Sequence, residues 1–344
     1  MKRKPQGPGK QADGTEDRFT GPAWRDRDGR GARRRKRIRI GAAVVVAAGA
    51  AVLVLNPGDI RSNLPGRLGG DTTAAAPLPP ETAAPGAAPA DEAFPATPTL
   101  AAPFAGLPAV RYAAAAAGIV LPDAGPVGRL SKDEVADVLR KAKELLTDAN
   151  LNPRTLRGER PTAALGLIDP LRTDVREDVA AGLAKPDRDH DPLRLFTRFD
   201  PHEVRLVGDV VKTRGRMTFE EGRDGAPALH TDHTFVHPVV RAAPGASEVT
   251  RTVVRRVVGV EINDPARFRV TPGKLALTGY DSDFGNNACA VYDGFPHPQF
   301  PDSRAAAEAS GPATGPYDRS KELRDEKAGA CGTVSRIQGR GRAT

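Results

Sequence analysis

The sequence has few of the residues that usually mark a chemical site. It contains two cysteines, two methionines and one tryptophan among 344 residues, and aromatic residues make up 5%. Two cysteines without histidines at zinc-finger spacing do not make a zinc site. The G-x-S-x-G, Walker, H-E-x-x-H and G-x-G-x-x-G motifs are absent. The sequence therefore gives no support to the enzyme and nucleotide-binding classes that these motifs mark.

The positive charge is confined to one end of the chain. The formal net charge is +8, but residues 1–39 hold 14 Lys and Arg against 5 Asp and Glu. The other 305 residues hold 37 basic and 38 acidic side chains, so they are almost neutral. A near-neutral domain lacks the basic surface that nucleic acid requires, and we expect no nucleic-acid partner.

One long apolar run stands out from this polar background. Ile40–Leu55 has sixteen residues without a charge or a polar side chain. As a helix it would be about 24 Å long, near the short limit for crossing a bilayer core. Ile38 can lengthen it, because Arg39 can extend its charge into the headgroups. We expect a transmembrane helix over 38–55.

Basic residues before the run predict its orientation. Seven Lys and Arg lie within 30–39, whereas only Arg61 and Arg67 follow closely. This bias predicts that 1–37 is a disordered, basic cytoplasmic tail that also attracts membrane lipid, and that the C-terminal bulk lies outside the cell. A cleaved signal peptide is the alternative. It fits less well, because nearly forty residues precede the run and no small-x-small site follows it directly.

The next segment has the composition of a spacer. In Asp71–Pro108, 22 of 38 residues are Ala or Pro. Such a stretch favours extended, semi-rigid chain, so 56–126 is interpreted as an extracytoplasmic linker. Within it, 111–120 is either a short helix or more linker. At the other end, 337–344 is expected to be a disordered tail.

Residues 127–336 are expected to form the folded extracytoplasmic domain. Ser131 and Glu134 make a capping box, and apolar residues then recur at helical spacing as far as Ala149. Asn152-Pro153 and Asp169-Pro170 each resemble the start of a further helix.

After Pro201 the apolar period changes from 3.6 to 2. It predicts strands over 211–220, 229–240, 249–262 and 274–280. Helices followed by consecutive antiparallel strands predict an α+β domain, with N-terminal helices packed on a curved antiparallel sheet. The order of elements is that of cystatin-like and NTF2-like folds, an analogy that carries no function.

Two groups of polar residues are candidate metal ligands. His233 and His237 share a face of their strand while His230 points the other way, which favours surface or cross-strand histidines over a metal site. Asp281, Asp283 and Asn286 offer oxygen atoms of the kind that calcium prefers, but their spacing departs from the EF-hand pattern. A turn held by Asp and Asn side chains is the simpler interpretation.

Three further residues call for partners. Arg256 shares a strand face with valines, so burial of that face would require a carboxylate partner or a bulge. Cys289 and Cys331 form an even pair on the expected outer side, and we expect a disulfide that closes a loop of about 43 residues and contributes roughly 4 kcal/mol. Neither a catalytic residue nor a cofactor is predicted.

Several stretches resemble a known kind of protein. LNPRTLRGERP, TRGRMTFEEG, YDSDFGNNAC, DGFPHP and ACGTVSR are similar to segments of uncharacterised single-pass membrane proteins of high-GC actinobacteria. The resemblance covers roughly 130–336. It implies the same layout of basic tail, single span, spacer and outer domain, and it implies no activity.

These observations favour a membrane-tethered extracytoplasmic binding or accessory module of the cell envelope that is not an enzyme. Its partner would be an unknown envelope ligand or protein. Two alternatives stay open. One is an envelope hydrolase with an unrecognised site. The other is a factor in cell-envelope assembly or division that works through the cytoplasmic tail.

Overall fold

A computed structural model describes most of the expected domain. The described residues are 76–85, 96–128, 130–221, 227–263, 268–288, 291–300, 311–320, 323 and 332–334. The predicted basic tail, the transmembrane helix 38–55, the C-terminal tail 337–344 and both cysteines lie outside them. None of the helices among the described residues has the length and apolar character needed to cross a membrane.

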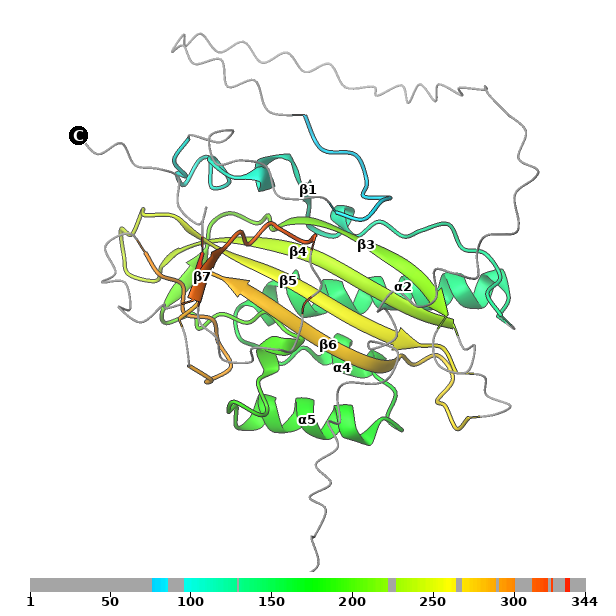
Figure 1. The fold of residues 1–344 in the computed structure, drawn as a ribbon. Coiled ribbons are helices and arrows are strands. Elements are labelled where there is room, and N and C mark those ends of the chain that lie inside the picture. The colour runs from blue at the N-terminus through cyan, green and yellow to red at the C-terminus, as the bar shows by residue number, and fades with distance from the viewer. Residues whose placement is uncertain are drawn as a thin grey trace, which may run out of the picture. The chain divides into compact units, whose positions relative to one another are not determined.

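An antiparallel sheet forms the centre of the domain (Figure 1). Its six strands are β1 (Ala113–Ala114), β2 (Val204–Leu206), β3 (Lys212–Glu221), β4 (Pro227–Arg241), β5 (Thr250–Glu261) and β6 (Ala276–Gly285). Their order is β1-β3-β4-β5-β6, with β2 paired to the end of β4. A separate parallel pair joins β7 (Gly311–Thr314) to β8 (Gly332–Val334). With the helices, this sheet confirms a mixed α+β fold.

The helices precede the long strands in the chain, as expected. They are α2 (Lys132–Asn150), α3 (Pro153–Leu156), α4 (Thr162–Leu167) and α5 (Thr173–Ala184), with short 3₁₀ helices η3 (Pro108–Arg111), η4 (Ala115–Gly118) and η5 (Pro192–Arg194). The capping box of α2 is confirmed: the Glu134 backbone N–H donates to the Ser131 hydroxyl at 3.3 Å, and Glu134 accepts from the Ser131 N–H at 2.8 Å. Asn152 caps α3 in the same manner.

One face of the sheet packs against these helices. Figure 1 shows α2 behind β4 and β5, and the alternating side chains of both strands point toward it. The buried residues of this core include Leu139, Leu146, Leu229, Phe235, Val254 and Val258. We call this the helix face. Because apolar side chains are removed from water on both layers, the contact supplies the main stabilisation of the domain.

The opposite face is also covered, which the sequence did not predict. Part of the expected linker packs there: Phe104, Leu107, Ala109 and Tyr112 are buried with Val236, Val253 and Tyr317. We call this the outer face, and we call residues 76–85 with 96–118 the strap. The folded unit thus extends into the segment 56–126 that composition assigned to the spacer.

The strap crosses from one face to the other at the sheet edge. β1 pairs with β3, and Ile119 just beyond it is buried in the helix-face core. Gly118 is required at this crossing, because an added Cβ atom would lie 2.2 Å from the backbone oxygen of Thr213. The buried apolar residues of the strap occur singly and show neither helical nor strand periodicity. From its composition alone, the strap therefore resembles a spacer.

The segment expected to be a turn at 281–287 is instead largely strand. Asp281, Ser282 and Asp283 continue β6 and pair with Val257, Arg256 and Arg255 of β5. The chain leaves the sheet only at Asn286, whose φ of 69° lies in the left-handed region that asparagine tolerates. Pairing with a neighbouring strand has overridden the turn-forming composition of this stretch.

Candidate functional site

The strap and a C-terminal segment meet on the outer face. Within the strap, the Leu78 N–H donates to the Arg111 carbonyl at 2.9 Å, and the Arg111 Nε donates to the Ala76 carbonyl at 3.0 Å. The rings of Tyr112 and Tyr317 meet edge to face with centroids 6.3 Å apart. Segments more than 200 residues apart in the chain therefore share one apolar contact.

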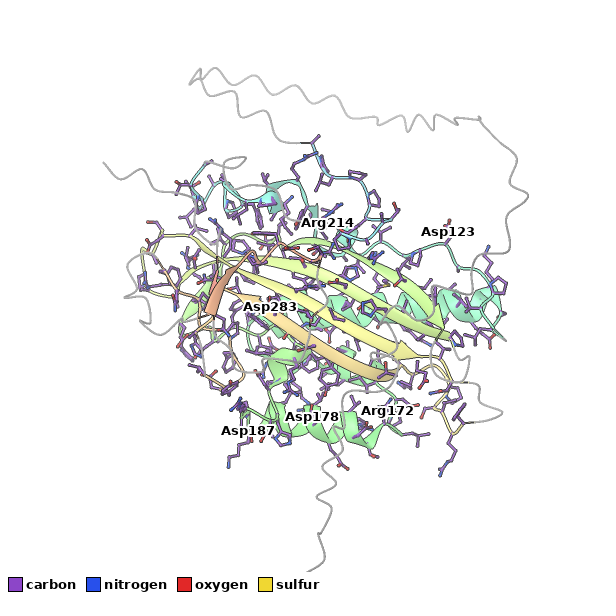
Figure 2. All side chains as sticks on the ribbon, in the orientation of Figure 1. Asp123, Arg172, Asp178, Asp187, Arg214 and Asp283 are labelled. Atoms are coloured by element: carbon purple, nitrogen blue, oxygen red, sulfur yellow. The ribbon has the colours of Figure 1, made fainter. Side chains whose placement is uncertain are left out.

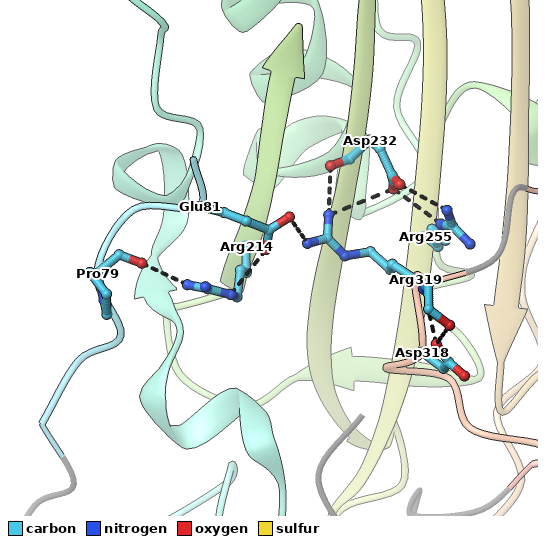
Figure 3. A network of polar contacts seen from close by, with 8 residues as sticks. Pro79, Glu81, Arg214, Asp232, Arg255, Asp318 and Arg319 are labelled. Atoms are coloured by element: carbon cyan, nitrogen blue, oxygen red, sulfur yellow. Dashed lines mark hydrogen bonds and ion pairs between the residues drawn. The ribbon is translucent and has the colours of Figure 1, made fainter. Parts of the chain in front are cut away.

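A chain of ion pairs, drawn in Figure 3, lies next to this contact, since Arg214 stands 5.9 Å from the centroid of the Tyr112 ring. Glu81 of the strap binds Arg214 on β3 at 3.1 Å and also pairs with Arg319. Arg319 donates to the Asp232 carbonyl on β4 at 2.7 Å. The Asp232 carboxylate accepts two bonds from Arg255 on β5, at 3.1 and 2.8 Å. The network links the strap, three strands and the C-terminal segment, and we call it the clasp.

Burial gives the clasp its strength. The side chains of Glu81, Arg319, Arg255 and Asp232 are 7%, 4%, 9% and 10% exposed. Solvent and salt screen such pairs far less than pairs on the surface, and removal of one partner would leave a buried charge uncompensated. The clasp therefore stabilises the packing of the strap and the C-terminal segment on the sheet.

The electrostatics of the clasp follow from its composition. Burial alone would raise the pKa of Asp232, but its hydrogen bonds from Arg255 and the charge of Arg319 outweigh burial and hold that pKa below the usual value. Asp283 lies opposite Arg255, and there burial wins and raises the pKa of the carboxyl. The contrast reflects two direct hydrogen bonds at Asp232.

A second polar layer lies on the helix face. Arg256 is fully buried and donates to the Leu193 carbonyl, to the Asn150 amide oxygen at 3.2 and 3.3 Å, and to the Thr197 hydroxyl at 3.3 Å. These acceptors are neutral, whereas the sequence led us to expect a carboxylate or a bulge. Burial lowers the pKa of Arg256 to about 9. The residue ties the C-terminus of α2 to β5.

The histidines divide as the strand pattern predicted. His233 and His237 both point to the helix face and are fully buried. His237 contacts the Asn150 carbonyl at 3.0 Å, while neither ring nitrogen of His233 has a hydrogen-bond partner in the part of the chain that the structure describes. Burial lowers the pKa values to about 3 and about 4 for His233 and His237. Since both rings lie in the core, they are not placed to exchange protons with an outside substrate.

Gly215 makes room for the first of these rings. It pairs with His233 across β3 and β4, and a Cβ atom there would lie 2.4 Å from the imidazole. A glycine in the middle of a strand weakens it, so close approach of a large neighbour is the physical reason for this one.

Another buried arginine has a different environment. Arg251 on β5 is 0% exposed, and among the described residues none of its three guanidinium nitrogens has a hydrogen-bond partner. Burial lowers its pKa to about 10, while Tyr317 partly offsets the shift. A buried charge without hydrogen bonds destabilises a fold. Arg256 has hydrogen-bond acceptors for its guanidinium and Arg251 has none among the described residues, so substitutions at the two positions should change the free energy of unfolding in opposite directions.

The candidate calcium ligands have other roles in the structure. Asp281 and Asp283 lie two positions apart on β6 and therefore share one face of the strand. The side-chain amide of Asn286 makes hydrogen bonds inside the protein. Its nitrogen donates to Thr250 at 2.9 Å and its oxygen accepts from the Gln299 N–H at 3.0 Å. In the part of the chain that the structure describes, no three His, Cys, Asp or Glu side chains cluster in a way that could hold a metal ion.

Sequence reasoning missed the clasp. Its one visible signal was Glu81, the only charged residue between Thr72 and Ala90 in an Ala/Pro-rich stretch. Its partners on β3, β4 and β5 become neighbours only through strand register, which spacing along the chain does not reveal. Comparison with protein-family models, with curated proteins and with solved structures found no match.

Proposed function

We propose that the chain is a membrane-tethered extracytoplasmic binding or accessory module of the cell envelope, anchored by 38–55 with its N-terminus in the cytoplasm. The apolar run and the basic residues before it support the tether and its orientation. The near-neutral charge of the rest of the chain supports a partner other than nucleic acid. The unknown partner would be an envelope ligand or protein.

The clasp is the observation that carries this proposal. A tether joined to a domain through a free linker would transmit any pull to the first helix. Here part of the segment 56–126, the strap, lies across the outer face, and Glu81 binds two arginines there. A pull applied through the N-terminal side of the strap would therefore pass into the sheet at the clasp.

Burial of the titratable groups favours binding over catalysis. A general base must reach the proton that it removes, within about 3 Å or through one water. His233 and His237 lie in the core, and the Asp232 carboxylate is committed to Arg255. These groups serve the fold, and this supports an accessory role over the alternative of an envelope hydrolase.

The architecture beyond the α+β class is part of the proposal. Helices followed by an antiparallel meander match the order in cystatin-like and NTF2-like folds. An experimental structure with α2 lying across a concave sheet face would support that assignment. A flat sheet, or a helix packed along a sheet edge, would contradict it.

Fractionation of cells tests the tether. Full-length protein should sediment with membranes, and protease added to intact spheroplasts should reach the domain. A variant lacking 38–55 should leave the membrane fraction. Membrane association that persists without this segment, or a domain protected from external protease, would refute the proposal.

A further inference from the structure

A small cleft lies between α4 and α5, away from the clasp. Its volume is about 70 Å³, and it is lined by Arg160, Leu165, Ile168, Arg176, Val179 and Ala180. Ile168 and Val179 are 3% and 4% exposed, and they form an apolar floor. Both arginines are exposed at its rim. A cavity of about 10–15 Å³ is enough to hold one water, so a compact group can enter this cleft.

Three acidic residues lie within two positions of Arg176 on α5, namely Asp174, Glu177 and Asp178, but none of them pairs with it among the described residues. The positions three and four residues away hold Arg172, Thr173, Val179 and Ala180. Side chains at these spacings are the ones that meet on a helix surface. Of these, Arg172 is the N-cap residue just before α5 (labelled in Figure 2) and is already bound by Asp174 at 2.8 Å. Among the described residues, Arg176 makes no ion pair.

Arg160 is in the same situation on the other side of the cleft. The neighbouring carboxylate, Glu159, binds Arg154 at 2.8 Å. Arg160 itself makes no ion pair within the part of the chain that the structure describes. Its charge also reaches Arg198: burial lowers the pKa of Arg198, and Arg160 lowers it further. Acidic residues lie close to both arginines in the chain, but among the described residues neither Arg160 nor Arg176 forms an ion pair with one.

We infer that the cleft is a binding site for a phosphate group carried on an apolar or weakly polar body. Guanidinium groups bind phosphate oxygens through paired hydrogen bonds. A phosphate offers the two arginines more acceptor oxygens and, as a dianion, more negative charge than a carboxylate does. The floor of Ile168 and Val179 would receive the carbon atoms next to the phosphate. This inference concerns the domain alone and does not depend on where the protein resides.

Calorimetric titration of the full-length protein tests this site. The probes are inorganic phosphate, hexyl phosphate, hexanoate and hexanol. Hexyl phosphate should bind several-fold more tightly than inorganic phosphate, because its carbon atoms cover the floor. It should also bind more tightly than hexanoate, and hexanol should not bind measurably.

The variant R160Q/R176Q should weaken hexyl phosphate binding by about tenfold or more, because two charge-assisted contacts are lost. K132Q/K185Q is the matched control, since it removes two exposed positive charges outside the cleft. The control should bind hexyl phosphate as tightly as the parent protein does, and both variants should have the melting temperature of the parent protein. Equal loss in both variants, unchanged binding by R160Q/R176Q, or hexanoate bound as tightly as hexyl phosphate would each overturn the assignment.

Discussion

The buried histidines predict that this domain loses stability in mild acid. His233 and His237 are fully buried, and burial lowers their pKa values to about 3 and about 4 from the usual 6.5. Below pH 6.5 the unfolded chain takes up protons at both positions while the folded chain does not. The unfolded state then binds more protons, so the free energy of unfolding falls as the pH falls.

The size of the effect follows from these pKa values. Between pH 7.5 and 5, each histidine should remove about 2 kcal/mol, and the pair about 4 kcal/mol. That is a large part of the roughly 5–15 kcal/mol by which a typical domain is stable.

Other groups act outside this window or in the opposite direction. Asp232, with a lowered pKa, loses its contribution only as the pH falls from its ordinary 3.8 toward the lower folded value. Burial would lower the pKa of His297, but its bonds to Asp293 and Glu203 outweigh burial and raise it. His297 therefore adds stability as the pH falls through its folded pKa, and that gain is complete below 6.5. The charges that reach His233 come from Arg319, Asp232, His230 and Lys143.

Urea unfolding followed by circular dichroism at pH 7.5, 6.5 and 5 measures the effect. His233→Leu should lose about half of the decrease, because one of the two titrating rings is gone. His202→Gln, at an exposed position, is the control and should behave as the parent protein does. A parent protein that loses less than about 1 kcal/mol between pH 6.5 and 5, or a His233→Leu variant with the full decrease, would refute the reasoning.

Three further predictions address the clasp, the buried arginine and the cysteines. Glu81→Gln should lower the free energy of unfolding by about 3 kcal/mol, because it removes the acid that two largely buried arginines share; an unchanged urea midpoint would show that the strap is not fastened by this residue. Arg251→Met should raise the free energy of unfolding by about 2 kcal/mol and with it the melting temperature, because a buried charge without hydrogen bonds among the described residues is replaced by an apolar side chain. A lower melting temperature would mean that the guanidinium stabilises the fold. Cys289 and Cys331 should be bonded in protein recovered from the cell surface, and mass spectrometry of non-reduced peptides that found both as free thiols would contradict this.

Periodicity along the chain predicted the regular elements well. The capping box at Ser131, the stripe of α2 and the alternation of β3, β4 and β5 are local patterns, and each matches the structure. The opposite orientations of His230 and His233 follow from alternation alone. What the chain does locally was therefore readable from the sequence.

Contacts made across the fold were not readable. The strap buries single residues such as Leu107 and Tyr112 on a surface that exists only once the sheet has formed. Arg256 is satisfied by Asn150, more than 100 residues away, because strand register and the end of α2 bring them together. Asp283 lies in a segment whose composition is typical of a turn, but it continues β6 because the backbone of β5 pairs with it. In each case tertiary pairing decided the outcome.

Labelling in intact cells tests the central claim, a domain held outside the membrane on a single anchor. Single cysteines at Thr15 and Lys185, introduced into full-length protein with Cys289 and Cys331 replaced by serine, are treated with a membrane-impermeant thiol reagent. We expect labelling at position 185 alone in intact cells and at both positions after permeabilisation. Labelling at position 15 in intact cells, or at neither position until the cells are opened, would contradict it.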